Sequence, residues 1–160
     1  EVARRVAEEG APFSGTASYV YTALTTLLSY KSPTVRLEGD FGSYEGEILL
    51  AATGITSSYG GGMKMVPAAI VDDGLFDVCI IESIPRRTVV RMLITLFWGG
   101  HTSHRAVSMH RTKSLAIQTD PPVLLYADGE RICYTPATIE MIERGLTVIV
   151  PGACKSWGRR

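Results

Sequence analysis

Residues 16–38, TASYVYTALTTLLSYKSPTVRLE, contain the change of periodicity that decides the fold. In the first part of this stretch, apolar residues recur every three or four positions, at Val20, Leu24, Leu27 and Leu28. This spacing predicts an amphipathic helix over residues 16–30. The helix is expected to end before Pro33, because proline forces the preceding residue into extended geometry. Beyond Pro33 the period becomes two, as Val35 and Leu37 alternate with polar residues, and a strand is predicted.

The rest of the chain is expected to be mostly short strands separated by glycine-containing or Asp-Gly turns. They are predicted at residues 47–54, 63–67, 76–82, 106–110, 114–118, 123–127, 131–134, 138–142 and 147–150. This spacing predicts a mainly antiparallel β-sandwich or flattened barrel. Helices are predicted at residues 1–9 and, among the strands, at residues 86–98, between Pro85 and Gly99-Gly100.

Composition and charge narrow the class of protein. The 160 residues are 46% hydrophobic and 20% charged, so the chain can bury a core. Sixteen basic residues balance sixteen acidic ones, which argues against a nucleic-acid partner. The cysteines at positions 79, 133 and 154 form no CxxC pair, so reduced thiols in the cytoplasm are expected. No apolar run reaches the roughly 18 residues of a membrane span. One domain, residues 1–154, with a tail at 155–160, fits this length.

Three glycines, Gly60, Gly61 and Gly62, follow one predicted strand and precede another. A phosphate-cradling loop would lead into a helix, so a P-loop is excluded. Glycine also permits close approach of a ligand or of another backbone, and this makes the three residues candidates for substrate binding. A bulged turn between two strands is the equally good structural interpretation.

Two acidic turns are candidates for chemistry. The first, Asp72-Asp-Gly-Leu-Phe-Asp77, offers three carboxylates in six residues, which is typical either of a hairpin turn or of a hard-cation site. The second, Asp128-Gly129-Glu130, lies between two apolar strands. It is either a solvated hairpin turn or the place of a carboxylate that accepts a proton from a hydroxyl. His101 and His104 have HxxH spacing, but without an adjacent acid they are weak candidates for metal ligands.

The predicted helix at residues 86–98 begins with Arg86, Arg87 and Arg91, whose charges oppose the helix dipole. Two interpretations account for its large apolar residues. The helix packs its apolar side on the sheets, which is the favoured interpretation, or it lies at the surface of an anionic membrane.

Taken together, four segments resemble the carboxy-terminal half of bacterial diacylglycerol kinase-like lipid kinases, a superfamily shared with sphingosine, ceramide and NAD kinases. They are Tyr59-Gly-Gly-Gly-Met-Lys-Met-Val-Pro67, Asp72-Asp-Gly-Leu-Phe-Asp-Val78, Gly100-His101 and Ala127-Asp-Gly-Glu130. The resemblance implies the second domain of a two-domain enzyme, a β-sandwich that contributes to a lipid-acceptor cleft. The first domain of such kinases carries a GGDGT-type motif and binds ATP, and no GGDGT occurs in this chain.

The resemblance also implies roles for particular residues. Glu130 matches the proposed proton acceptor of the family, and Asp128 on the same turn is its rival. A structural Mg²⁺ would be held by the Asp73 side chain, with Ile70 and Leu75 contributing main-chain oxygens. ATP would be the co-substrate, bound mainly by the missing domain.

The leading hypothesis is therefore the lipid-acceptor-binding half of an ATP-dependent kinase that phosphorylates a diacylglycerol-like hydroxyl, in the cytoplasm or peripherally at a membrane. The chain begins with Glu1 rather than Met, so a piece of a longer protein, inactive when isolated, is expected. Two alternatives stay open. One is a non-catalytic lipid-binding or regulatory β-sandwich, and the other is the same half of a sphingoid-base kinase or an NAD kinase.

Overall fold

The computed structural model describes residues 25–26, 30–59 and 62–149. The predicted helix at residues 1–9 and the tail at 155–160 lie outside these residues. Of the predicted helix at 16–30, Thr25 and Thr26 are described as helical. No helix in the described ranges is long and apolar enough to cross a membrane.

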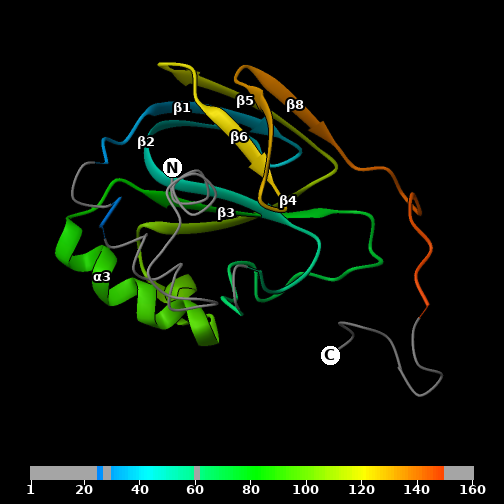
Figure 1. Cartoon of the computed structure of the whole chain (residues 1–160), viewed down its shortest axis with the longest axis horizontal. Helices are drawn as coiled ribbons and strands as arrows, with labels where there is room; N and C mark the ends of the chain where they lie inside the picture. Colours follow the sequence, from blue (N-terminus) through cyan, green and yellow to red (C-terminus); the bar gives the residue numbers. More distant parts are fainter. Residues whose placement is uncertain (1–24, 27–29, 60–61, 150–160) are drawn as a thin grey trace.

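The described residues form eight strands, one α-helix and two short 3₁₀ helices (Figure 1). In chain order they are β1 (Thr34–Gly39), β2 (Gly42–Gly54), β3 (Phe76–Glu82), α3 (Arg86–Thr95), η1 (Leu96–Trp98), η2 (Gly100–Ser103), β4 (Val107–Thr112), β5 (Ser114–Asp120), β6 (Leu124–Ala127), β7 (Glu130–Tyr134) and β8 (Ala137–Glu140).

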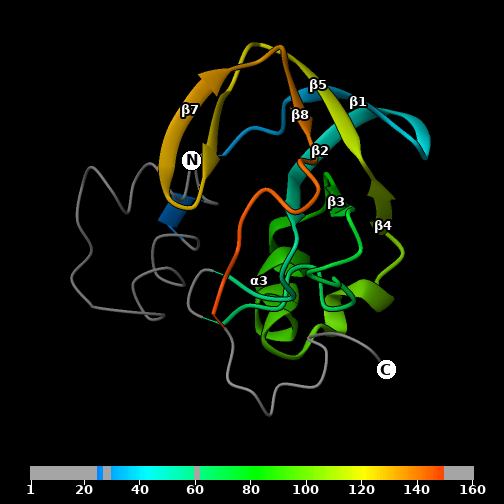
Figure 2. The ribbon, with the colours of Figure 1, turned by 90° about the vertical axis from the view of Figure 1, so that its right-hand side faces the viewer.

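Six strands form one antiparallel sheet in the order β4-β3-β2-β1-β5-β8, and β6 and β7 form a separate two-stranded sheet. The 13-residue strand β2 joins the two halves of the large sheet. Its first half pairs with β1 as far as Glu47, and its second half pairs with β3 from Ile48 onward. A shift of register between Ile48 and Leu50 marks the join, and such irregularities bend a strand. The sheet is thereby folded into two layers (Figure 2).

The two layers enclose one hydrophobic core, and β3 forms its centre. Val78 and Ile80 point into this core and are fully buried. They meet apolar residues of β1, β2 and β5: Val35, Leu37, Ile48, Leu115 and Ile117. The antiparallel β-sandwich predicted from the alternating pattern is confirmed.

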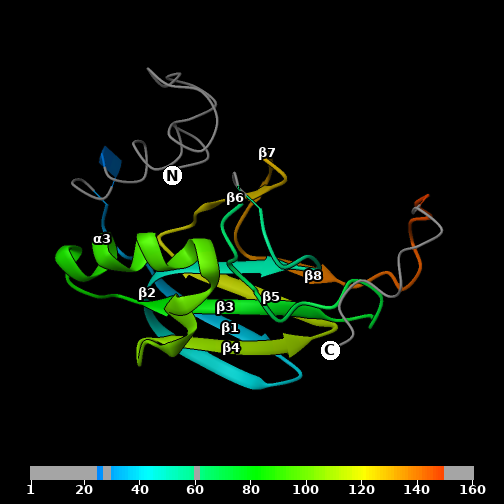
Figure 3. The ribbon, with the colours of Figure 1, turned by 90° about the horizontal axis from the view of Figure 1, so that it is seen from below.

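A second core lies between the opposite face of β3 and helix α3. Cys79 and Ile81 alternate with the residues of the first core and are buried against Met92 and Leu96. Burial raises the pKa of the Cys79 thiol to about 11. Strand β3 is therefore apolar on both faces, with α3 alongside it (Figure 3). This confirms that α3 packs one side on the sheet.

Two predicted strands are wrong. Residues 63–67 form no strand, although Met65 and Val66 are buried. Their backbone hydrogen bonds are not those of a strand ladder. The Lys64 amide donates to the Leu96 carbonyl (2.8 Å), and the Met65 amide donates to the Met63 carbonyl (3.1 Å). The apolar run is thus a loop that covers the second core. Residues 147–149 also form no strand, and the side chains of Val148 and Ile149 are exposed.

Candidate functional site

Glu130 is the first residue of β7, next to a tight turn. Ala127 and Glu130 pair across the hairpin, and Asp128 and Gly129 form the two-residue loop between them. Both loop residues have positive φ, 50° and 89° respectively, as a type I′ turn requires. The carboxylate of Glu130 is exposed, and among the described residues it has no ion-pair partner. Asp128 is part of the loop, and aspartate tolerates the left-handed backbone conformation that the loop requires.

The strand that carries Glu130 is exposed along its whole length. The register of the hairpin shifts within β7: Ile132 and Cys133 both lie between the Tyr126–Arg131 and Leu124–Tyr134 pairs, so the regular alternation of side chains is interrupted there. Ile132 is 61% exposed and Tyr134 is 65% exposed. The hairpin therefore offers a carboxylate at its tip, followed by two exposed apolar side chains on β7.

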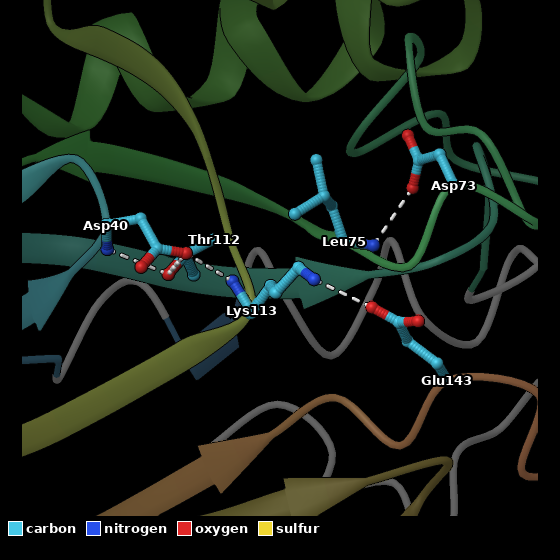
Figure 4. Close-up of polar contacts among 6 residues, drawn as sticks. All are labelled: Asp40, Asp73, Leu75, Thr112, Lys113 and Glu143. Atoms are coloured by element: carbon cyan, nitrogen blue, oxygen red, sulfur yellow. Dashed lines mark hydrogen bonds and ion pairs between the residues drawn. The ribbon is translucent and has the colours of Figure 1, made fainter.

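The acidic turn before β3 is ordered by the side chain of Asp73. Its Oδ1 accepts a hydrogen bond from the Leu75 amide (3.0 Å, Figure 4). Gly74 between them has a φ of +73°, a conformation that favours glycine. The Glu143 side chain also leaves little room there, since a Cβ on Gly74 would lie 3.2 Å from Glu143 Cγ. Ile70, the third predicted member of the metal site, lies three residues before Asp73.

Strand pairing brings Arg111 of β4 to this turn. Arg111 lies opposite Asp77 in the β3–β4 ladder, and its guanidinium forms an ion pair with Asp73 Oδ2. Its Nε lies 3.7 Å from Asp77 Oδ2. Asp77 is buried, and this Oδ2 has no hydrogen-bond partner among the described residues. Burial raises the pKa of the Asp77 carboxyl.

Three further polar contacts hold the loops next to the turn (Figure 4). Lys113 Nζ donates to Glu143 Oε1 (2.7 Å), and the amide of Lys113 donates to Asp40 Oδ2 (2.7 Å). Thr112, which is fully buried, accepts from the Asp40 amide through Oγ1 (2.9 Å). The hydrogen bond from Lys113 lowers the pKa of the exposed Glu143 carboxyl. These contacts fix the acidic turn between β4, the β1–β2 turn and the segment after β8.

The residues at the acidic turn fit a hard cation. Asp73 supplies a carboxylate on an ordered turn, and Asp77 supplies a buried carboxylate oxygen without a hydrogen-bond donor. In the structure the positive charge that contacts both acids is the Arg111 guanidinium. No group of three or more His, Cys, Asp and Glu suited to a metal occurs in the described ranges. A cation at Asp73 would therefore depend on main-chain oxygens, such as those of Ile70 and Leu75, and on displacement of Arg111.

We expect Arg111→Met to make the thermal stability of the chain depend on Mg²⁺. Without the guanidinium, Asp73 and Asp77 lose their counter-charge, and the free energy of unfolding should fall by roughly 1.5 kcal/mol, at the low end for hydrogen bonds to charged groups. Tm should fall by roughly 3–6 °C in EDTA and recover in millimolar Mg²⁺. Differential scanning fluorimetry with and without Mg²⁺ measures both effects.

Asp73→Ala is the matched variant, since it removes the carboxylate on the turn itself, which is the side-chain ligand that the metal hypothesis requires. Its Tm should be lower than that of the unmodified chain and should not respond to Mg²⁺. If Asp73→Ala leaves thermal stability unchanged with and without Mg²⁺, the structural-metal hypothesis is wrong.

The three histidines have separate structural roles. His101 is buried, and its Nε2 lies 3.0 Å from the Met65 carbonyl oxygen. Burial lowers the pKa of His101, so its neutral form is favoured, although the hydrogen bond to Met65 opposes this shift. His104 Nδ1 accepts from the Ala106 amide (3.2 Å), and His110 stacks on Phe41 with 4.4 Å between ring centroids. The HxxH spacing therefore reflects local packing.

Of the three glycines predicted to bind substrate, Gly60 and Gly61 lie outside the described residues. Gly62 has a φ of +95°, and a Cβ there would meet open space. It belongs to a narrow turn closed by two backbone hydrogen bonds between Tyr59 and Met63 (3.0 and 3.1 Å). The role of these glycines in substrate binding stays a prediction.

Comparison with known proteins gives the class of this domain. The model of the family described as the YegS C-terminal NAD kinase beta sandwich-like domain matches residues 1–150. This chain belongs to that family, whose relatives include proteins named diacylglycerol kinase.

Two of these relatives come from Mycobacterium tuberculosis and Staphylococcus epidermidis. The first, from strain CDC 1551 / Oshkosh, is 36% identical over 105 residues, which are 66% of this chain and 34% of that protein. The second is 31% identical over 137 residues, which are 86% of this chain and 43% of that protein. The chain thus spans less than half the length of either relative.

A solved structure of a diacylglycerol kinase from Bacillus anthracis str. Sterne has the same fold. Its TM-score is 0.61 at 23% sequence identity, and the match covers 78% of this chain and 43% of that one. This likeness confirms the sandwich expected from the resemblance to lipid kinases.

Sequence reasoning missed Arg111 and Glu143 as neighbours of the acidic turn. Arg111 is 38 residues from Asp73 in the chain, and Lys113 is 30 residues from Glu143. The signal for Arg111 was the register of two predicted strands: if residues 76–82 and 106–110 pair as antiparallel neighbours, Arg111 falls near the start of β3.

Proposed function

We propose that this chain is the lipid-acceptor-binding part of an ATP-dependent lipid kinase that phosphorylates a diacylglycerol-like hydroxyl. The observation that carries the proposal is the exposure of the whole of β7, on which Glu130 is followed by the apolar residues Ile132 and Tyr134. A lipid alcohol needs both features: a carboxylate beside its hydroxyl and an apolar surface beside its acyl chains. The names of the relatives support the same class of acceptor.

In this reaction Glu130 accepts the proton of the lipid hydroxyl while the hydroxyl oxygen bonds to the terminal phosphorus of ATP and ADP leaves. A solvated carboxylate on a tight turn suits this task, because the turn fixes its position and no described residue neutralises its charge. Mg²⁺ with the nucleotide supplies neutralisation of charge on the transferred phosphoryl group. This part of the site would come from the nucleotide-binding domain of the kinase. We therefore expect the 160 residues alone to form no phosphatidic acid.

Acceptor binding tests the proposal without requiring turnover. Saturation-transfer NMR with dioctanoylglycerol should show saturable binding to the chain. Ile132→Ser should raise the Kd by about 10-fold or more, because burying an isoleucine side chain is worth roughly 1.5–3 kcal/mol.

Ile142→Ser is the matched control, since it makes the same substitution at an exposed isoleucine outside β7. It should leave the Kd unchanged. Absence of binding, or an equal loss in both variants, would show that β7 does not hold the acceptor.

A further inference from the structure

Helix α3 and the adjoining η1 carry apolar side chains on two opposite sides. One side is buried toward the second core through Val89, Met92 and Leu96. The other leaves four large apolar residues at the surface: Val90 (41% exposed), Ile94 (61%), Phe97 (36%) and Trp98 (61%). Packing on the sheet therefore explains only half of the apolar character of this helix. Figure 3 shows α3 alongside the strands, so that its outer side faces away from them.

Basic residues accompany the exposed apolar ones. Arg87 and Arg91 are exposed and lie three to four positions from Val90 and Ile94, on the same side of the helix. The first turn of α3 contains no acidic residue, and no Asp or Glu occurs anywhere between Glu82 and Asp120. Cations near the amino end of a helix oppose its dipole, so an external anion beside these arginines would stabilise the helix.

Trp98 is held in place at the end of this surface. The chain turns at Gly99, which has a φ of +79° and ends η1. A Cβ on the next residue, Gly100, would lie 2.6 Å from Trp98 Nε1, so the indole lies against the bare backbone of this glycine. A large amphipathic ring that is fixed and yet mostly exposed is typical of an anchor at a membrane–water interface.

We propose that the α3 surface, formed by Arg87, Val90, Arg91, Ile94, Phe97 and Trp98, docks on an anionic lipid bilayer. Its apolar side chains would enter the boundary between headgroups and acyl chains, and its arginines would pair with lipid phosphates. The positive charge of this surface favours an anionic partner. Arg86, Arg87 and Arg91 are basic, and no Asp or Glu occurs in the segment between Glu82 and Asp120. The proposal goes beyond acceptor recognition, because it concerns contact with the membrane itself and does not involve Glu130.

Sedimentation with vesicles that lack diacylglycerol tests this surface separately from acceptor binding. The chain should sediment with vesicles of phosphatidylcholine and phosphatidylglycerol and should stay in the supernatant with phosphatidylcholine alone. Arg87→Gln combined with Arg91→Gln should lower the partition coefficient roughly 30-fold, since each basic residue at an anionic surface contributes about a fivefold effect. Ile94→Ser combined with Trp98→Ser should lower it by about 10-fold or more. High salt should weaken binding of the unmodified chain.

Ile142→Ser is the control, because Ile142 is 78% exposed and lies outside this surface; it should bind as the unmodified chain does. Circular dichroism melts establish that each variant is folded. If the unmodified chain binds no anionic vesicle, or if both double variants bind normally, the proposal is wrong. It is also wrong if size-exclusion chromatography shows a dimer that the Ile94–Trp98 double variant dissolves, since a second copy would then cover the surface.

A spectroscopic readout in the otherwise intact protein completes the test. The chain has two tryptophans, so Trp157→Phe leaves Trp98 as the only one. Brominated lipids in anionic vesicles should quench its emission and shift it to the blue. Unchanged emission in the presence of bound vesicles would place the contact on another part of the chain.

Discussion

Replacing Glu130 by glutamine in a kinase that contains this chain and its nucleotide-binding part is expected to lower kcat by about 10²–10⁴-fold. This is the usual contribution of a general base, equivalent to roughly 3–5 kcal/mol of barrier. Glutamine keeps the shape of the side chain and part of its hydrogen bonding but cannot take up the proton. The lipid KM should stay nearly constant, because Ile132 and Tyr134 still offer their apolar side chains. Steady-state kinetics under conditions in which chemistry limits turnover measure the effect.

Asp128→Asn is the companion variant on the same turn. Asp128 has a φ of 50°, and asparagine tolerates this conformation as well as aspartate does. The variant should therefore retain most of its kcat, and any cost should appear in stability. If Glu130→Gln retains more than about a tenth of the kcat while Asp128→Asn loses it, the base is Asp128.

Ile80→Ala should be the most destabilising of the simple truncations on β3. Ile80 is fully buried in the first core, between Ala51 of β2 and Ser108 of β4 in the sheet. Large-to-small changes at such sites cost about 2–5 kcal/mol, and little collapse is available here because layers lie on both faces of β3. Tm should fall by roughly 5–15 °C. Urea unfolding followed by circular dichroism gives the change in free energy directly.

Ile94→Ala serves as the control for this loss, since Ile94 is 61% exposed on α3. Surface substitutions of this kind usually change stability by about 0.5 kcal/mol or less. A similar loss at both positions would mean that β3 is not the centre of the core.

The parts of the fold that were predictable from sequence are those in which local pattern and burial agree. Strand β3 was predicted with its observed bounds, because it combines β-branched and apolar residues between an Asp-Gly turn and Pro85. The helix at 86–98 was predicted as one element and is formed by α3 and η1 together. The strand at 63–67 was predicted wrongly because burial of Met65 and Val66 gives the same apolar signal in a loop as in a strand.

In the candidate site, too, only the residues with an informative local sequence could be predicted. Asp73 and Glu130 could be named as candidates because each lies on an Asp-Gly turn within a segment that resembles the lipid kinases, and their roles stay predictions. Arg111 was not found, because its contact with Asp73 and Asp77 depends on the register of β3 against β4. No local pattern around Arg111 distinguishes it from any solvated arginine. When the partner of a charged residue is distant in the sequence, the contact can be predicted only if the pairing of the strands is known.

The division of strand β2 between the two layers has a consequence for how this domain unfolds. The strand gives its first half to one layer and its second half to the other, so one sheet of hydrogen-bonded neighbours runs from β4 to β8. Melting either layer removes the neighbour of a strand that the other layer needs, and it also exposes the core that the two layers share. A half-melted species therefore has little to stabilise it, and the domain should lose its structure as one cooperative unit, as small single-domain proteins commonly do.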